Sequence, residues 1–233
     1  GTAFWGIITI ACATLRVRST RLYNRLTVKW ARTLLRGSGS WVRVQGLDRV
    51  DWSQPAVLVA NHVGSFEILG LAVSIPVPYY FVAKKELEAI PIFGRAWKAA
   101  GHISIDRENR QKALESLRQA AETMHRTRGI VIIFPEGTRS RTGELQPFKK
   151  GAFQLAISAG VPIIPTIVTG SEEIMPHGSW RVRPGIMDIY IGDPVPIDGY
   201  APEDVDRLIE LVHGRMREML RQGREERRLA AAK

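Results

Sequence analysis

A histidine and a carboxylate lie five residues apart in the stretch Asn61-His62-Val63-Gly64-Ser65-Phe66-Glu67. On a regular helix, positions five apart point about 140° away from each other, so the two side chains meet only if His62 lies in a turn and Glu67 in the first turn of the helix that follows. Glu67 would then accept a hydrogen bond from one ring nitrogen and leave the other nitrogen as a general base. Taken alone, the stretch is also typical of an ordinary helix start, with Asn61 as its N-cap and both side chains exposed.

A second stretch, Phe134-Pro135-Glu136-Gly137-Thr138-Arg139-Ser140, follows an apolar run and suits a phosphate. Its proline ends the strand, Gly137 permits a tight turn close to a ligand, and Arg139 can hold a phosphate through two parallel hydrogen bonds. Two other strand-like runs also end in cations, namely Lys84 and Arg107. If these strands are parallel, their carboxyl ends meet at one edge of the sheet, where α/β proteins bind ligands. Each cation alone is also compatible with a solvated surface turn.

Short apolar runs alternate with helical patterns along most of the chain. The runs predict strands over residues 56–60, 79–83, 103–105, 130–134, 163–168 and 186–191. Helices are expected over residues 66–75, 86–99, 108–127, 149–159 and 202–221. This alternation predicts an α/β fold with a mostly parallel sheet flanked by helices, which we expect to span residues 41–223. The charged and then alanine-rich tail at 224–233 is expected to be flexible.

Residues 1–40 differ from the rest of the chain. The net charge is +10, and residues 1–50 carry nine basic side chains against Asp48 alone. An uncharged apolar run at 1–15 is shorter than the ~20 residues that span a bilayer. It precedes a helical pattern in which one stripe is basic and the neighbouring stripe is apolar, with Leu22, Leu26, Trp30 and Leu34. The pattern predicts two helices that dock on an anionic membrane surface. The alternative is a helix packed on its own domain with a solvated basic face.

Other classes of protein receive less support from the sequence. The single cysteine, Cys12, excludes a disulfide framework and a cysteine-rich metal site. No Gly-x-Ser-x-Gly elbow occurs, so Ser65 is not supported as the nucleophile of a hydrolase. No aromatic-basic sheet pattern or zinc-ligand spacing points to nucleic acid as a partner. The two stretches together therefore indicate a hydroxyl that is activated by His62 on a substrate held by its phosphate.

In this order, the blocks resemble those of the glycerolipid acyltransferases, specifically the 1-acylglycerol-3-phosphate acyltransferases of the bacterial PlsC type. The first block resembles the family's Asn-His-x-Ser-x-x-Asp, with Glu67 in place of the usual aspartate. The other three blocks resemble GHISIDR at 101–107, FPEGTRS at 134–140 and VPIIP at 161–165. The resemblance covers residues 55–170.

The resemblance also implies roles for individual residues. His62 would be the general base for the acceptor hydroxyl, and Glu67 would orient it. Arg139 would bind the acceptor's phosphate, with Glu136 and Gly137 shaping its loop. Lys84 and Arg107 would be further cations at this phosphate site, and the run at 161–165 would help line the acyl or donor site.

The implied reaction moves a fatty acyl group from a thioester to the sn-2 hydroxyl of 1-acylglycerol-3-phosphate, which gives phosphatidic acid. The donor would be acyl-CoA or the acylated acyl carrier protein, and neither a metal nor a redox cofactor is implied. We expect such an enzyme at the cytoplasmic face of the inner membrane. Two alternatives stay open, namely an acyltransferase for another lysolipid and a non-catalytic protein that binds anionic lipid.

Overall fold

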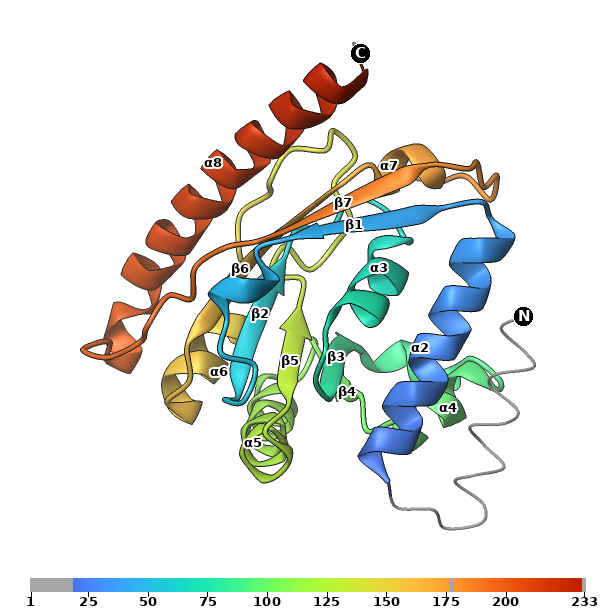
Figure 1. The fold of residues 1–233 in the computed structure, drawn as a ribbon. Coiled ribbons are helices and arrows are strands. Elements are labelled where there is room, and N and C mark those ends of the chain that lie inside the picture. Colours follow the sequence, from blue (N-terminus) through green and yellow to red (C-terminus); the bar gives the residue numbers. More distant parts are fainter. Residues whose placement is uncertain (1–18, 177, 232–233) are drawn as a thin grey trace.

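Seven strands form one sheet in the order β1-β7-β6-β2-β5-β3-β4 in the computed structural model, which describes residues 19–176 and 178–231 (Figure 1). The strands are β1 (Trp41–Gln45), β2 (Ala56–Ala60), β3 (Tyr79–Lys84), β4 (Ile103–Ile105), β5 (Ile130–Ile133), β6 (Ile163–Thr169) and β7 (Ile186–Ile191). Only β7 against β6 is an antiparallel pair, while the other neighbours run parallel. The predicted α/β fold with a mostly parallel sheet is confirmed.

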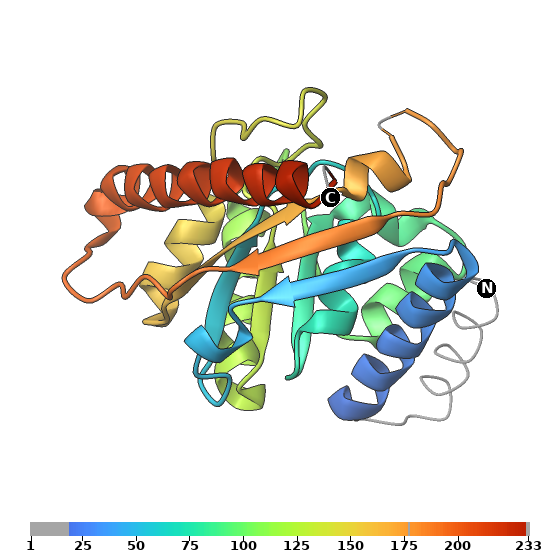
Figure 2. The same ribbon diagram turned by 45° about the horizontal axis from the view of Figure 1, so that its top comes forward.

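Helices cover both faces of this sheet. They are α2 (Thr20–Gly37), α3 (Glu67–Ser74), α4 (Phe93–Ala99), α5 (Arg110–Thr127), α6 (Gly151–Ala159), α7 (Ser171–Ile174) and α8 (Val205–Ala231), with short 3-10 turns at Leu47–Arg49, Lys85–Ala89 and Pro202–Asp204. One apolar cluster joins the sheet to α2, α3 and α4, and a second joins it to α5, α6 and α8. Figure 2 shows β7 and β1 passing between α8 and α2.

The central strands are buried on both faces. Every residue of β2, β5 and β6 is buried, as expected for parallel strands with helices on either side. Along β2, Leu58 packs toward α2 and α3, whereas Val57 and Val59 pack toward α5, α6 and α8. These uniformly apolar runs explain why the sequence predicts the central strands well.

Two elements differ from the sequence-based expectations because their patterns are irregular. Strand β1 was not predicted, since it lies at an edge of the sheet and no residue in it is fully buried. The helix expected over 86–99 is divided into a 3-10 turn at Lys85–Ala89 and α4. Pro91 lies between the two parts and has no N–H to offer to a continuous helix.

The tail expected to be flexible at 224–233 continues α8 as far as Ala231. Side chains of this last part bind the rest of the domain: Arg224 pairs with Glu144, and Arg227 pairs with Glu173 and Asp188. Asp188 lies on β7 and is also bound by Arg43 of β1, at 2.5 Å. These ion pairs tie the end of α8 to β1, α7 and β7, and they are the physical reason for the difference.

Helix α2 corrects the expectation for its apolar stripe. Leu26 is buried, Leu22 packs beside it, and Trp30 and Leu34 pack against the main cluster of the domain. The stripe that we expected in a membrane therefore packs against the protein's own core, as in the alternative of a helix packed on its own domain. The first of the two expected helices falls in residues 1–18, outside the described residues. Among the described helices, none is both long and apolar enough to span a membrane.

Asp188 provides a test of the ion pairs that hold α8. Asp188→Ala is expected to lower the free energy of unfolding by about 2–3 kcal/mol, because it leaves two arginines without their buried partner. Urea denaturation measures this change. Asp206→Ala is the matched control, since it removes an exposed pair with Lys150 and should cost about 1 kcal/mol or less. Equal losses in the two variants would contradict a structural role for the buried pair.

Candidate active site

Asn61 fixes the point at which the chain leaves β2. Its side-chain amide donates to the carbonyl of Val168 at 2.9 Å and its oxygen accepts from the Val168 N–H at 2.7 Å. The side chain thus acts as an additional peptide group that extends the pairing of β2 with β6. Asn61 is not a helix N-cap, which was the alternative open at the sequence level. The next residue, His62, is placed by this anchor at the carboxyl edge of the sheet.

His62 and Glu67 meet in the predicted arrangement. His62 lies in the turn and Glu67 is the first residue of α3, with 2.5 Å between His62 Nδ1 and Glu67 Oε1. The imidazole also stacks on Phe134 with ring centroids 4.4 Å apart. Glu67 is completely buried, whereas the His62 side chain is 19% exposed. A carboxylate on Nδ1 sets the tautomer and leaves Nε2 as the nitrogen that can take a proton.

The carboxylate of Glu67 is held at both oxygens. Oε1 also accepts from the backbone N–H of Val63 at 3.2 Å and of Gly64 at 3.0 Å. Oε2 accepts from the hydroxyl of Ser171. Burial opposes ionisation, but the hydrogen bond from His62, the attraction to His62 and the hydrogen bond from Ser171 outweigh it and hold the pKa of Glu67 below its usual value.

Ser171 is a site residue that the sequence does not reveal. Its hydroxyl donates to Glu67 and also accepts from the Glu67 N–H at 3.2 Å, so it completes the uncapped start of α3. Ser171 is fully buried at the beginning of α7. A Cβ on Gly64 would lie 2.4 Å from the Ser171 hydroxyl, so only glycine fits at this position without a shift. Ser171 lies 104 residues from Glu67, and its segment carries no recognisable motif.

The loop after β5 binds to the backbone of His62. The Glu136 carboxylate accepts from the His62 N–H at 2.8 Å and from the Gln146 N–H at 3.3 Å, while the Ser140 N–H donates to the His62 carbonyl at 2.7 Å. Glu136 is buried, and burial is the main cause of its raised pKa. Its acceptor atoms serve the loop itself, so Glu136 shapes the site and is not offered to a ligand.

The predicted phosphate residues gather at the same edge of the sheet. Arg139 donates to the Ser65 hydroxyl at 2.8 Å, which joins the two sequence stretches and gives Ser65 a role that the sequence alone did not suggest. Gly137 adopts the left-handed φ of 74° that favours glycine, and its carbonyl accepts from Arg107 at 2.7 Å. Lys84 ends β3 at this edge and, within the described residues, has no identified hydrogen bond to the other predicted site residues. In Figure 1 the loop 134–150 extends beyond this edge.

The arrangement supplies a base, a carboxylate that orients it, and cations a short distance along the same edge. Among the described residues, no cluster of three or more histidine, cysteine or acidic side chains could hold a metal ion. The chemistry that the side chains themselves can perform is proton abstraction beside an anion-binding loop.

Ser171→Ala tests the contribution of the hydrogen bond from Ser171 to Glu67. The variant is expected to lose about 1–3 kcal/mol of unfolding free energy, because a buried carboxylate oxygen loses its donor. The pKa of Glu67 should also rise. A carboxylate whose pKa is lowered by folding stabilises the protein above its unfolded pKa, and that stabilisation disappears as the pH falls through the folded pKa. The folded pKa of Glu67 in the variant should therefore lie closer to the unfolded pKa, so the variant should lose less stability than the parent as the pH falls.

Urea unfolding followed from about pH 7 down to about pH 3 measures this effect. Ser158→Ala is the control, because the one hydrogen bond identified for the Ser158 hydroxyl in the described part of the chain is to the Leu155 carbonyl of its own helix, α6. Parallel pH profiles for the parent and Ser171→Ala would show that Ser171 does not act on the ionisation of Glu67.

The chain is similar to known acyltransferases. The family model described as Acyltransferase matches residues 41–169. The chain is 35% identical to the 1-acyl-sn-glycerol-3-phosphate acyltransferase alpha of Homo sapiens, over 79% of this chain and 65% of that protein. It is 34% identical to the 1-acyl-sn-glycerol-3-phosphate acyltransferase of Haemophilus influenzae, over 73% of this chain and 70% of that protein. The corresponding protein of Cocos nucifera is 32% identical over 85% of this chain, which spans 63% of its length.

A solved structure shares the whole fold. The crystal structure of the 1-acyl-sn-glycerophosphate acyltransferase PlsC of Thermotoga maritima superposes with a TM-score of 0.76, over 96% of this chain and 95% of that chain, at 23% sequence identity. The family match runs from the start of β1 to the end of β6, so it covers more than half of the chain. It includes both sequence stretches of the site. The protein therefore belongs to the acyltransferase family.

Proposed function

We propose that the protein transfers a fatty acyl group from a thioester to the free sn-2 hydroxyl of 1-acylglycerol-3-phosphate, which yields phosphatidic acid for phospholipid synthesis. The observation that carries the proposal is the 2.5 Å pair of His62 and Glu67 beside the loop of Arg139. The family membership and the names of the relatives support the same substrate class.

In the proposed reaction, the Nε2 atom of His62 takes the proton of the acceptor hydroxyl. The hydroxyl oxygen attacks the thioester carbonyl, the carbon–sulfur bond breaks, and the thiolate leaves with the proton returned by His62. Glu67 stabilises the imidazolium that forms during this step, since both of its oxygens are already held. The stacked ring of Phe134 keeps the imidazole in its plane.

Arg139 is the residue that we propose for the acceptor's phosphate. It is partly exposed, and its one identified hydrogen bond within the described residues is to a neutral hydroxyl, so its guanidinium keeps donors for an anion. Gly137 and Glu136 hold the loop in shape, and Arg107 and Lys84 add positive charge along the same edge.

The donor in this proposal is acyl-CoA or the acylated acyl carrier protein, and the reaction needs neither a metal nor a redox cofactor. Acceptor and product are membrane lipids, so we place the enzyme at an anionic membrane surface, on the cytoplasmic face of the inner membrane. No nucleic acid takes part.

The reaction is tested with purified full-length protein, 1-acylglycerol-3-phosphate and a labelled acyl thioester, with both donor types. The parent protein should form phosphatidic acid, and His62→Ala should reduce turnover by about a hundredfold or more, as expected for the loss of a general base. The melting temperature of the variant shows whether it is folded. Undiminished turnover in folded His62→Ala would overturn the assignment of the base.

The phosphate site is tested with Arg139→Ala. We expect the KM for the lysophosphatidate to rise by about tenfold or more, because a charge-assisted hydrogen bond is lost, while the KM for the thioester stays the same. Arg141→Ala is the matched control, since Arg141 is exposed two residues further along the same loop. A rise confined to the thioester KM would place the acceptor's phosphate elsewhere.

A further inference from the structure

Helix α2 presents a row of cations to solvent. Its apolar stripe is used by the domain itself, and its sequence contains no acidic residue. Within the described residues, none of the exposed cations of α2 forms an identified ion pair; these are Arg21, Arg25, Lys29, Arg32 and Arg36. The row therefore has a single sign of charge along the length of the helix, which attracts anionic partners.

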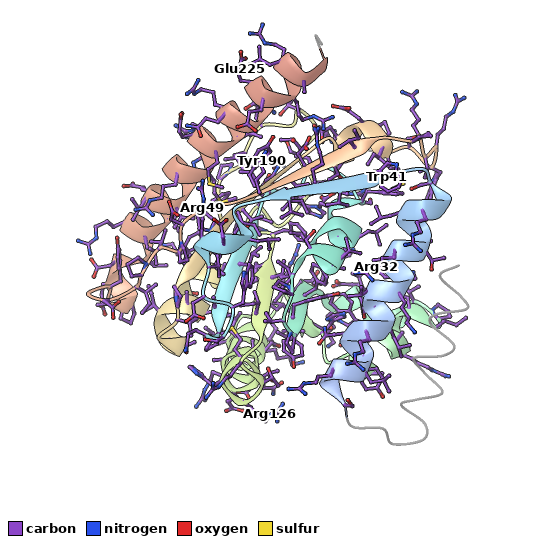
Figure 3. The ribbon with its side chains drawn as sticks, viewed as in Figure 1. Arg32, Trp41, Arg49, Arg126, Tyr190 and Glu225 are labelled. Atoms are coloured by element: carbon purple, nitrogen blue, oxygen red, sulfur yellow. The ribbon has the colours of Figure 1, made fainter. Side chains whose placement is uncertain are left out.

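A tryptophan lies just beyond the C-terminal end of this helix. Trp41 is 71% exposed at the first position of β1, although its backbone N–H is fixed by the Gly185 carbonyl at 2.9 Å. Figure 3 shows Arg32 of α2 and Trp41 on the same side of the molecule. An aromatic ring that is mostly exposed on a well-anchored strand presents apolar surface to water beside the cations of α2.

The segment that joins α7 to β7 brings a second tryptophan to the same end of the molecule. Trp180 is 94% exposed, and the run 180–184 alternates apolar and basic side chains, all of them exposed: Trp180, Arg181, Val182, Arg183 and Pro184. The run leads into β7, whose first residue, Ile186, is in register with Trp41. In Figures 1 and 2 the segment lies at the end of the sheet where α2 passes into β1.

We propose that Arg32, Arg36, Trp41 and the run 180–184 form one docking surface for an anionic lipid bilayer. Tryptophan side chains are enriched at the level of the lipid headgroups, because the ring N–H can bind water or a headgroup while the rest of the ring contacts the acyl chains. Arginine side chains beside them pair with headgroup phosphates, and each adds to the attraction of an anionic surface. The combination of a uniform positive charge with exposed aromatic rings is the chemistry of a membrane interface.

The docking surface is connected to the active site by a short path along the chain. Ser171, which holds Glu67, begins α7, and the exposed run begins nine residues later. The identity of the lipid in the active site depends on the proposed function, but the attraction of the docking surface to a bilayer does not. Docking here would bring the carboxyl edge of the sheet close to the membrane in which a lipid acceptor resides.

Sedimentation of the full-length protein with vesicles tests the docking surface. Vesicles of phosphatidylcholine alone are compared with vesicles that also contain about 30 mol% phosphatidylglycerol. Trp41→Ser combined with Trp180→Ser, and separately Arg181→Gln combined with Arg183→Gln, should each raise the lipid concentration for half-maximal binding to the anionic vesicles by about threefold or more. The rise caused by the two arginine substitutions should be smaller at high salt, because salt screens the attraction between arginine and the anionic surface.

Matched controls remove similar groups from helices on the other face of the sheet. Leu114→Ser with Leu229→Ser removes two exposed apolar side chains, and Arg118→Gln with Arg126→Gln removes two exposed cations. The controls should bind vesicles as the parent does. Three outcomes would overturn the proposal and point to a protein partner for this surface. The lipid concentration for half-maximal binding could rise less than about threefold in the docking variants, or it could rise equally in the controls. The parent could also bind both kinds of vesicle equally well.

Turnover separates this proposal from the proposed function. With an acceptor presented in vesicles, the docking variants should be slower than the parent. With a short-chain lysophosphatidate that is soluble as a monomer, their turnover should equal that of the parent. A parent protein that acylates neither acceptor would refute the proposed function, while the sedimentation result would still decide whether the surface binds lipid.

Discussion

The peptide group of His62 is the point through which the site is assembled. Its N–H donates to Glu136 and its carbonyl accepts from Ser140, so the loop after β5 is bound to the turn after β2 on both sides of the histidine. Asn61 anchors that turn to β6. Two stretches joined by contacts that span 74 residues of the chain thus become one unit. Arg139 keeps its position relative to the imidazole because its loop cannot move without breaking hydrogen bonds to the base itself.

The glutamate at position 67 is accommodated by its neighbours. Its carboxylate binds His62 with one oxygen and Ser171 with the other. This is possible because Gly64 has no side chain to displace the Ser171 hydroxyl. Groups from its own turn and from the start of α7 therefore hold the glutamate, and its carboxylate stays ionised although it is completely buried.

Much of the fold and the core of the site could be predicted from the sequence, for physical reasons that also explain the failures. Buried parallel strands such as β2 are uniformly apolar, and a base with its carboxylate lies within one turn, so both leave local signals. The role of Ser171 depends on a contact across 104 residues, which no local pattern contains. No residue of the edge strand β1 is fully buried, and the end of α8 is fixed by ion pairs of Arg227. The apolar stripe of α2 could not be assigned, because a membrane and a protein core select the same residues.

The packing of α2 has a practical consequence for preparing the protein without detergent. Ala31 and Leu35 of this helix are buried in the same cluster as β2 and α3. A truncation at residue 40, chosen to remove an amphipathic segment, would uncover α3 and the part of the core cluster that α2 covers. Losing even a single buried leucine costs about 2–5 kcal/mol, so such a shortened chain would aggregate rather than dissolve. A cut made before Ser19 would keep every core contact that α2 supplies.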